Sequence, residues 1–78
     1  MKVNKNKNVI GKKQTQRALI KDKAVSVYIA ENADRKVVKD IVEISNEKKI
    51  EIIYVDTMEN LGKMFGIDVK AAVAATLR

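Results

Sequence analysis

The residues best suited to bind a ligand stand together near the amino end, in the segment Gly11-Lys12-Lys13-Gln14-Thr15-Gln16-Arg17. Val9-Ile10 predicts a short strand before it, and residues 12–21 predict a helix that begins within it. The first N–H groups of a helix have no intrahelical partner and lie at the positive end of its dipole, so they bind anions. Lysines at that end are unfavourable for an isolated helix. We therefore expect a phosphate backbone to dock there.

Two side chains of this segment could also read bases. Gln14 offers both a donor and an acceptor, which the edges of bases can use. Arg17 lies one helical turn beyond Lys13 and Gln14 and carries a planar fork of donors. A solvated helix start remains the alternative reading. The segment is not a phosphate-binding P-loop, because the glycine spacing of that motif is absent.

A second candidate segment is Gly66-Ile67-Asp68-Val69-Lys70, between a predicted helix and the last predicted strand. Two aliphatic residues beside a glycine could form an exposed apolar contact surface, and a neighbouring lysine suits a polyanion. They could equally fold back onto the core. Both readings stay open at this point.

The chain contains few residues that could support enzymatic catalysis. It contains no histidine and no cysteine, which excludes Ser-His and Cys-His catalysis and every metal site built on those ligands. Carboxylates remain, and a magnesium or calcium site made of them alone is formally open: Asp34, Asp40, Glu43, Asp56, Glu59 and Asp68. Their spacing matches no known metal loop, and we read them as capping or solvated residues. We expect no enzymatic activity, no cofactor and no metal.

Charge is distributed unevenly. The net charge is +6; residues 1–23 hold eight basic residues and one acidic residue, whereas residues 24–78 hold eight basic and nine acidic ones. Such asymmetry indicates a polyanionic partner that contacts one part of the surface. A solubilising tail is the alternative, but the basic residues continue past Gly11 into the predicted helix.

These residues must be positioned by a small α/β core. Residues 24–30 and 50–55 are nearly continuously apolar and rich in β-branched side chains, which predicts strands covered on both faces. Between them, residues 34–48 predict a helix that Asn32 or Asp34 could cap. The apolar stripe of this helix comprises Val37, Val38, Ile41, Val42 and Ile44. A strand–helix–strand unit of this kind predicts two parallel strands with a right-handed crossover.

The remaining segments complete the layers. Ala18, Leu19 and Ile20 are the expected apolar side chains of helix 12–21. Helix 58–65 is expected to turn Leu61, Met64 and Phe65 inward and to end at a left-handed Gly66.

Residues 71–77 favour a helix by alanine propensity, but a helix apolar on every side would need more protein around it than 78 residues provide. We predict a closing central strand. The result is a three-layer α/β/α sandwich with a small four-stranded mixed sheet, forming one domain over residues 1–78 in which residues 1–8 fray.

The most apolar windows are about seven residues long, far short of the ~20 that cross a bilayer. We expect no membrane contact, a cytoplasmic location and a monomer.

GKKQTQRAL, YIAENAD, IIYVDTMENLGKMFG and GIDVKAAVAA, which fall between residues 9 and 77, together resemble the ribosomal protein L-seven-Ae and L-thirty-e superfamily. The nearest likeness is to its small bacterial branch, the ribosome-associated L-seven-Ae-like proteins. The LGKxxGI pattern before the alanine-rich strand is its most specific part. Members bind kink-turn RNA, a duplex–bulge–duplex element that is sharply bent at tandem sheared G·A pairs.

The resemblance assigns roles by position. Gly11 matches the family glycine, Lys13 and Gln14 stand at the sites of its Asn-Glu pair, and Arg17 matches a family lysine. It implies that these side chains reach the G·A bases, while Lys12 and nearby backbone amides contact phosphates.

The resemblance also assigns Ile67, Asp68 and Val69 to the loop that packs against an extruded nucleotide, and Asp34 to an acidic contact of some relatives. Two departures matter. Glutamine at position 14 replaces a carboxylate, and a neutral amide accepts hydrogen bonds from guanine more weakly. The family's usual C-terminal helix has no counterpart before Arg78.

We therefore expect an RNA-binding protein that stabilises kink-turn RNA, with ribosomal RNA and the ribosome as its setting. Its binding should be looser than that of the archaeal ribosomal proteins. The alternative is a protein–protein adaptor of the same fold that acts through the Ile67/Val69 loop.

Overall fold

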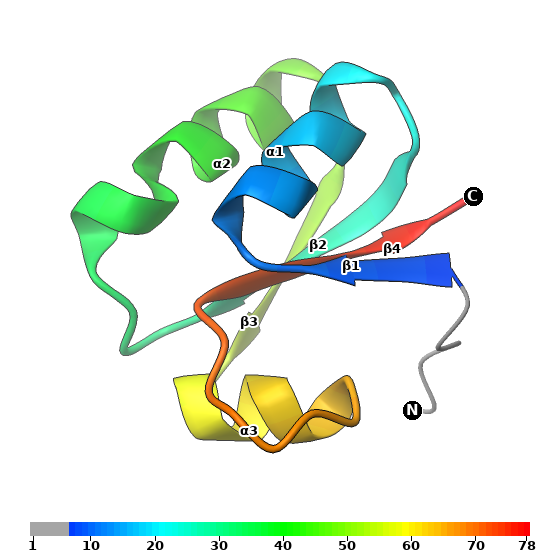
Figure 1. Cartoon of the computed structure of the whole chain (residues 1–78). Helices are drawn as coiled ribbons and strands as arrows, with labels where there is room; N and C mark the ends of the chain where they lie inside the picture. Colours follow the sequence, from blue (N-terminus) through cyan, green and yellow to red (C-terminus); the bar gives the residue numbers. More distant parts are fainter. Residues whose placement is uncertain (1–6) are drawn as a thin grey trace.

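A computed structural model describes residues 7–78 and contains seven elements, in the order strand, helix, strand, helix, strand, helix, strand (Figure 1). They are β1 (Asn8–Ile10), α1 (Lys12–Ile20), β2 (Ala24–Ala30), α2 (Arg35–Glu47), β3 (Glu51–Val55), α3 (Met58–Met64) and β4 (Val73–Leu77). Each predicted helix and strand is present within one or two residues of its expected bounds. The expected fraying of residues 1–8 falls mostly outside the described residues; Asn8 already pairs with Thr76.

The four strands form one mixed sheet in the order β1-β4-β2-β3. β2 and β3 are parallel, with Val27 opposite Ile52, as the strand–helix–strand pattern predicts. β4 runs antiparallel to both of its neighbours, β1 and β2. Residues 73–77 thus form a central strand despite their alanine content. Within it, Ala74 and Ala75 are completely buried.

Three layers result, since α1 and α2 cover one face of the sheet and α3 covers the other (Figure 1). On the α3 side, the rings of Tyr28 and Phe65 meet edge to face with centroids 5.2 Å apart. Edge-to-face aromatic pairs add about 0.5–1.5 kcal/mol beyond the area they bury. The predicted three-layer α/β/α sandwich is confirmed. No helix among residues 7–78 is both long enough and apolar enough to cross a membrane.

Two apolar side chains of the predicted helices are exposed. Met64, which was expected to face inward, is 37% exposed, and Ile20, one of the expected apolar side chains of α1, is 60% exposed. In α1 the buried positions are Thr15, Ala18 and Leu19, and one further residue turns the side chain about 100° around the helix, away from the sheet. At α3, Leu61 and the C-cap residue Phe65 lie four residues apart and supply the buried contact.

The helix ends resolve the two capping alternatives. Asp34 caps α2, because its Oδ1 accepts a hydrogen bond of 2.9 Å from the N–H of Lys36. Asn32 has a different role: its Oδ1 accepts from the N–H of Met58 at 2.8 Å and so ties the loop after β2 to the start of α3. Gly66 has φ 76°, the left-handed conformation expected where α3 ends.

The buried hydroxyls are of two kinds. Ser26 and Thr76 share a hydrogen bond of 2.6 Å between β2 and β4. Ser45 of α2 and Thr15 of α1 are completely buried, and their hydroxyl oxygens have no hydrogen-bond partner within residues 7–78. A buried hydroxyl without a partner lowers stability, because it loses its bonds to water.

Replacing Ser45 by alanine should therefore raise the free energy of unfolding by about 0.5–1 kcal/mol, since it removes an unsatisfied hydroxyl and improves helix propensity. Ser26→Ala is the matched control and should lower that free energy by about 1 kcal/mol, because it breaks a hydrogen bond. Urea unfolding measures both. Equal losses from the two substitutions would show that Ser45 is satisfied.

Candidate nucleic-acid interface

The start of α1 is open to an anion. Its N-cap is Gly11, which has φ 103° and provides no side-chain cap, and the first turn contains no acidic residue. By contrast, Asp34 caps α2 and Thr57 caps α3 through side-chain oxygens. The free N–H groups at the start of α1 therefore point toward solvent or a ligand.

Cationic and amide side chains surround this helix start. Lys12 leans toward α2, with its Nζ 4.0 Å from a carboxylate oxygen of Asp40. Lys13, Gln14 and Arg17 are exposed, and neither Lys13 nor Arg17 forms an ion pair with any of the described residues. Two unpaired cations and one amide are thus available to an external partner.

The loop between α3 and β4 is held by backbone hydrogen bonds on both sides. The N–H of Ile67 donates to the carbonyl of Gly62 at 3.1 Å, and the N–H of Ala71 donates to that of Met58 at 3.0 Å. The carbonyl of Ala72 accepts from the N–H of Ala30 in β2, also at 3.0 Å. α3 and the sheet together fix the path of this loop.

The two aliphatic residues of the loop differ in exposure. Ile67 is half-buried and packs against the core, whereas Val69 is 68% exposed. Asp68, between them, is exposed as well. The two readings left open by the sequence therefore divide between these residues: Ile67 folds back onto the core and Val69 remains on the surface.

Gly62 explains why the loop can lie so close to α3. A Cβ built on this glycine would stand 2.1 Å from the carbonyl oxygen of Val69. Real Cβ atoms do not approach backbone so closely, so position 62 must lack a side chain for the loop to pass. The sequence marks Gly62 only as part of the LGKxxGI pattern and does not reveal this contact.

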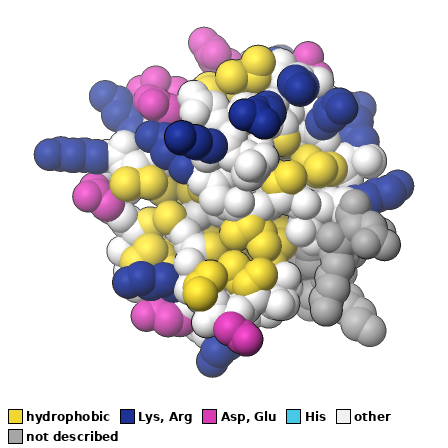
Figure 2. Space-filling model, viewed as in Figure 1, with side chains coloured by type: hydrophobic (Ala, Val, Ile, Leu, Met, Phe, Trp, Pro, Cys, Tyr) yellow, Lys and Arg dark blue, Asp and Glu magenta, His cyan; other side chains and the backbone are white. Residues whose placement is uncertain are grey.

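A backbone hydrogen bond connects the helix start with the end of the loop. The N–H of Gly11 donates to the carbonyl of Val73, the first residue of β4, at 2.9 Å. The loop therefore ends where α1 begins, and the start of α2 with Asp34 lies at the same end of the sheet. Figure 2 shows Lys and Arg side chains over α1 with a group of hydrophobic side chains below them, toward α3. The segments that carry Gly11, Asp34 and Val69 therefore meet at one end of the sheet.

Two hollows beside α2 are lined by both acidic and basic side chains. One of about 340 Å³ is lined by Glu31, Arg35 and Tyr54 among others. Its neighbour, of about 420 Å³, combines Arg35, Lys36 and Lys39 with Glu43. Within residues 7–78 no three Asp or Glu side chains gather as a metal site would require.

Replacing Gly62 by alanine should push residues 67–70 away from α3 and lower the free energy of unfolding by about 1–3 kcal/mol, the usual cost of overpacking. Helix propensity alone predicts the opposite sign, a gain of up to about 1 kcal/mol. Urea unfolding and the amide NMR shifts of residues 67–70 measure the two effects. Lys63→Ala, at the next and exposed position, is the control. A stabilised Gly62→Ala protein would disprove the close approach.

Comparisons with known proteins place the chain among its relatives. The model of the ribosomal protein L7Ae/L30e/S12e/Gadd45 family matches residues 1–78. The chain is 54% identical over 69 residues to RNA-binding protein TTE2299 of Caldanaerobacter subterraneus, covering 88% of this chain and 84% of that protein. It is 48% identical over 67 residues to RNA-binding protein BH0128 of Halalkalibacterium halodurans, covering 86% and 82%.

Among solved structures, the Giardia lamblia 15.5kD RNA binding protein superposes with a TM-score of 0.87 at 20% identity, over 94% of this chain and 62% of that one. At this identity the likeness concerns the fold alone. The family model and the close relatives carry the assignment: this chain belongs to the ribosomal protein L7Ae/L30e/S12e/Gadd45 family, the L-seven-Ae superfamily that its motifs resemble.

Proposed function

We propose that this protein is a non-enzymatic RNA-binding module that recognises kink-turn RNA, with ribosomal RNA and the ribosome in the cytoplasm as its setting. The observation that carries the proposal is the hydrogen bond from Gly11 to Val73, which joins an uncapped, cationic helix start to a loop that exposes Val69. A bent RNA presents both phosphates and an unpaired nucleotide within a short distance. The helix start can bind the phosphates, and the exposed Val69 can contact the unpaired nucleotide. The names of the relatives, which are RNA-binding proteins, support the same class of ligand.

In this proposal the helix start binds the phosphate backbone. The free N–H groups of the first turn of α1 and the Lys13 ammonium supply charge-assisted hydrogen bonds to phosphate oxygens. Such contacts set position and affinity and do not by themselves read sequence. They also make binding depend on salt, because each neutralised phosphate releases counterions.

In this proposal, Gln14 and Arg17 contact the bases. The Gln14 amide can donate to one base and accept from its partner, which suits the exposed edges of a sheared G·A pair. Arg17 follows three residues later on the same side of α1 and adds a fork of donors. An amide oxygen accepts more weakly than a carboxylate, so we expect kink-turn binding to be looser than it would be with glutamate at position 14.

Val69 provides the second contact. An aliphatic side chain exposed beside the helix start can pack against the face of a nucleotide that the bend extrudes. The kinked conformer then contacts the protein at two places and the extended conformer at only one. The protein therefore shifts the RNA population toward the kink by its greater affinity for that state.

The exposure of Val69 also favours a second candidate, a protein–protein adaptor of the same fold. An adaptor would use the loop without the cations of α1. A protein complex that survives nuclease treatment, together with unchanged affinity for kinked and straight RNA, would favour the adaptor.

Replacing Gln14 by alanine should reduce affinity for a kink-turn about 5- to 30-fold, while affinity for a straight duplex changes less than twofold, since lost base contacts cost about 1–2 kcal/mol. Gel shift or fluorescence anisotropy on RNA with and without the G·A pairs measures this. The salt dependence should stay as in the parent, because glutamine carries no charge.

The charge control for this experiment is Lys39→Ala, at an exposed position of α2 that is not among the predicted site residues. It should weaken both RNAs slightly and equally. If Gln14→Ala also affects the kinked and straight RNAs alike, Gln14 does not read the kink.

Val69→Thr keeps the shape of the side chain and adds a hydroxyl at an exposed position, so stability should change by less than about 0.5 kcal/mol. We expect affinity for the kink-turn to fall about threefold to tenfold, because apolar contact with the extruded nucleotide is lost. Val25→Thr is the matched control: Val25 is 53% exposed at the start of β2, at the opposite end of the sheet. Equal effects of the two substitutions would exclude a specific role for Val69.

A further inference from the structure

The strand β3 forms a free edge of the sheet. It is the outermost strand in the order β1-β4-β2-β3, and within residues 7–78 it pairs with β2 alone. The carbonyl of Val55 is turned toward β2, because it accepts a hydrogen bond of 2.7 Å from the N–H of Glu31, just after that strand. Backbone groups alternate along a strand, so the N–H and C=O groups of Ile52 and Tyr54 point out of the sheet. Each of these two residues therefore offers one donor and one acceptor to a further strand.

This edge lacks the features that usually protect an edge strand. Protected edges carry lysine or proline, contain a bulge, or are very short. β3 has five residues, Glu51-Ile52-Ile53-Tyr54-Val55, and its pairing with β2 is regular throughout. The opposite edge of the sheet, β1, has only three residues. β3 is therefore the edge that gives an added strand the longer template.

A groove lies between the β3 edge and α2. A hollow of about 340 Å³ is lined by Arg35, Val38 and Val42 of α2 and by Tyr54 of β3, among others. The hollow of about 420 Å³ continues from it along α2, since the two share the same three residues of α2. We call the two hollows together the α2–β3 groove. Tyr54 is 56% exposed beside the half-buried Val42, so an apolar side chain placed next to Tyr54 would enter this groove.

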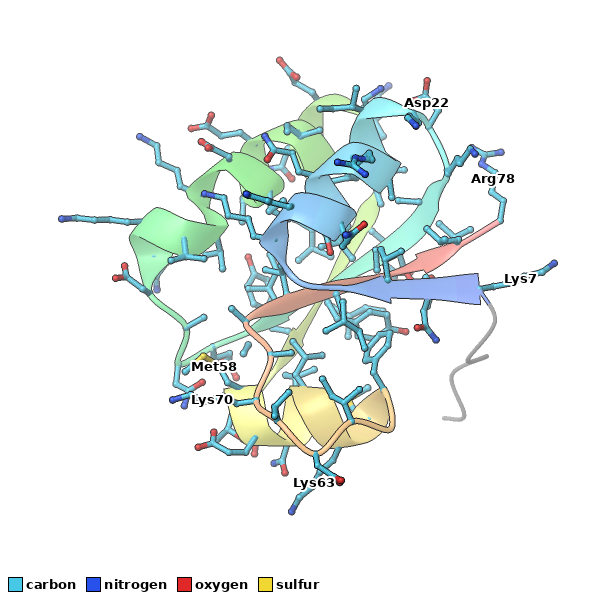
Figure 3. All side chains as sticks on the ribbon, in the orientation of Figure 1. Lys7, Asp22, Met58, Lys63, Lys70 and Arg78 are labelled. Carbon is cyan, nitrogen blue, oxygen red and sulfur yellow. The ribbon has the colours of Figure 1, made fainter. Side chains whose placement is uncertain are left out.

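The rim of the α2–β3 groove carries more cations than acids. Its charged residues are Arg35, Lys36, Lys39, Glu31 and Glu43. None of the three cations forms an ion pair with a residue in the described range 7–78. Figure 3 shows side chains that end in nitrogen extending from α2 into solvent, on the side away from α1. Acidic side chains of a ligand in the groove would therefore meet unpaired cations.

We propose that the β3 edge binds an extended peptide with a short apolar core flanked by acidic residues. The backbone of the peptide pairs with Ile52 and Tyr54 and adds a strand to the sheet, and the side chain opposite Tyr54 enters the α2–β3 groove. The flanking acids face the cations of α2. The groove contains none of the residues to which the proposed function assigns RNA contacts, so this inference does not rest on RNA binding.

Two other occupants suit the groove less well. A second copy paired through its own β3 would bring a second α2 with the same three cations, and each chain already carries a net charge of +6. Like charges across an interface oppose association. RNA has no strand-like backbone to pair with the edge, and Glu31 and Glu43 would repel its phosphates.

The probe is a capped peptide of three valines with two glutamates on each side. Its addition to the full chain should move the amide NMR shifts of Ile52, Tyr54 and residues 35–43. N-methylation of successive peptide amides should lower affinity about tenfold at every second position and little between them, because only alternate N–H groups face β3. The matched peptide with lysine in place of glutamate should bind at least about tenfold more weakly.

Two substitutions test the side-chain contacts. Tyr54→Thr keeps a residue that favours strands and should lower affinity for the glutamate peptide about threefold to tenfold. Lys39→Gln should lower it about twofold to fivefold at low salt and much less at high salt. Val25→Thr, exposed in β2, and Lys21→Gln, exposed at the end of α1, are the matched controls and should leave it unchanged. The methylation series changes only the peptide, so it decides the question even if a variant fails to fold.

The inference is overturned if N-methylation shows no alternation, or if the lysine peptide binds as well as the glutamate peptide. Self-association of the chain that is lost with Tyr54→Thr would assign the edge to a second copy and would also overturn it. So would kink-turn RNA that moves the amide shifts of Ile52 and Tyr54. Failure of the RNA-binding proposal is read separately, because Gln14→Ala and Val69→Thr should leave peptide affinity unchanged.

Discussion

The placement of β4 in the middle of the sheet is the constraint on which the interface depends. β4 pairs with β1 on one side and β2 on the other, and it is antiparallel to both. Its first residue therefore lies beside the last residues of β1, and the N–H of Gly11 reaches the carbonyl of Val73. Ala74 and Ala75 keep this strand narrow enough to be covered on both faces. A helix start and a distant loop thus meet, although more than fifty residues separate them in sequence.

The first turn of α1 lacks a side-chain cap of the kind that begins α2 and α3. This helix begins at Gly11, and glycine at this position is less stabilising than such a cap by a few tenths of a kcal/mol. Lys12 and Lys13 at the positive end of the dipole lower stability further, by tenths of a kcal/mol each at the surface. A chain of this size has little stability to lose. An uncapped, cationic first turn is consistent with a site at which an anionic ligand completes the helix.

The sequence predicted the elements well and their finer contacts poorly. Strand and helix bounds follow from local periodicity, and the central position of residues 73–77 follows from their lack of any polar face. The exposure of Ile20 was not predicted, because its helix has only nine residues, too few for the buried face to be unambiguous. In addition, Thr15, a polar residue, occupies one of the buried positions. The role of Gly62 could not be predicted, since it depends on the return of a loop several residues later. The start of α1 and the end of the α3–β4 loop meet at one end of the sheet, and the assignment of the site residues and their contacts with RNA stay a prediction.

Exposure alone is weak support for an interface, because single apolar side chains are common on protein surfaces. Position is what distinguishes Tyr54 and Val69. Val69 stands on a loop whose path is fixed by α3 and the sheet, so its side chain is presented by a rigid support. Tyr54 stands on the free edge of the sheet, beside cations that have no ion-pair partner within residues 7–78. Unpaired cations beside an apolar groove suit a ligand that combines apolar and acidic side chains. An extended peptide has that combination, and its backbone can also pair with the edge of the sheet.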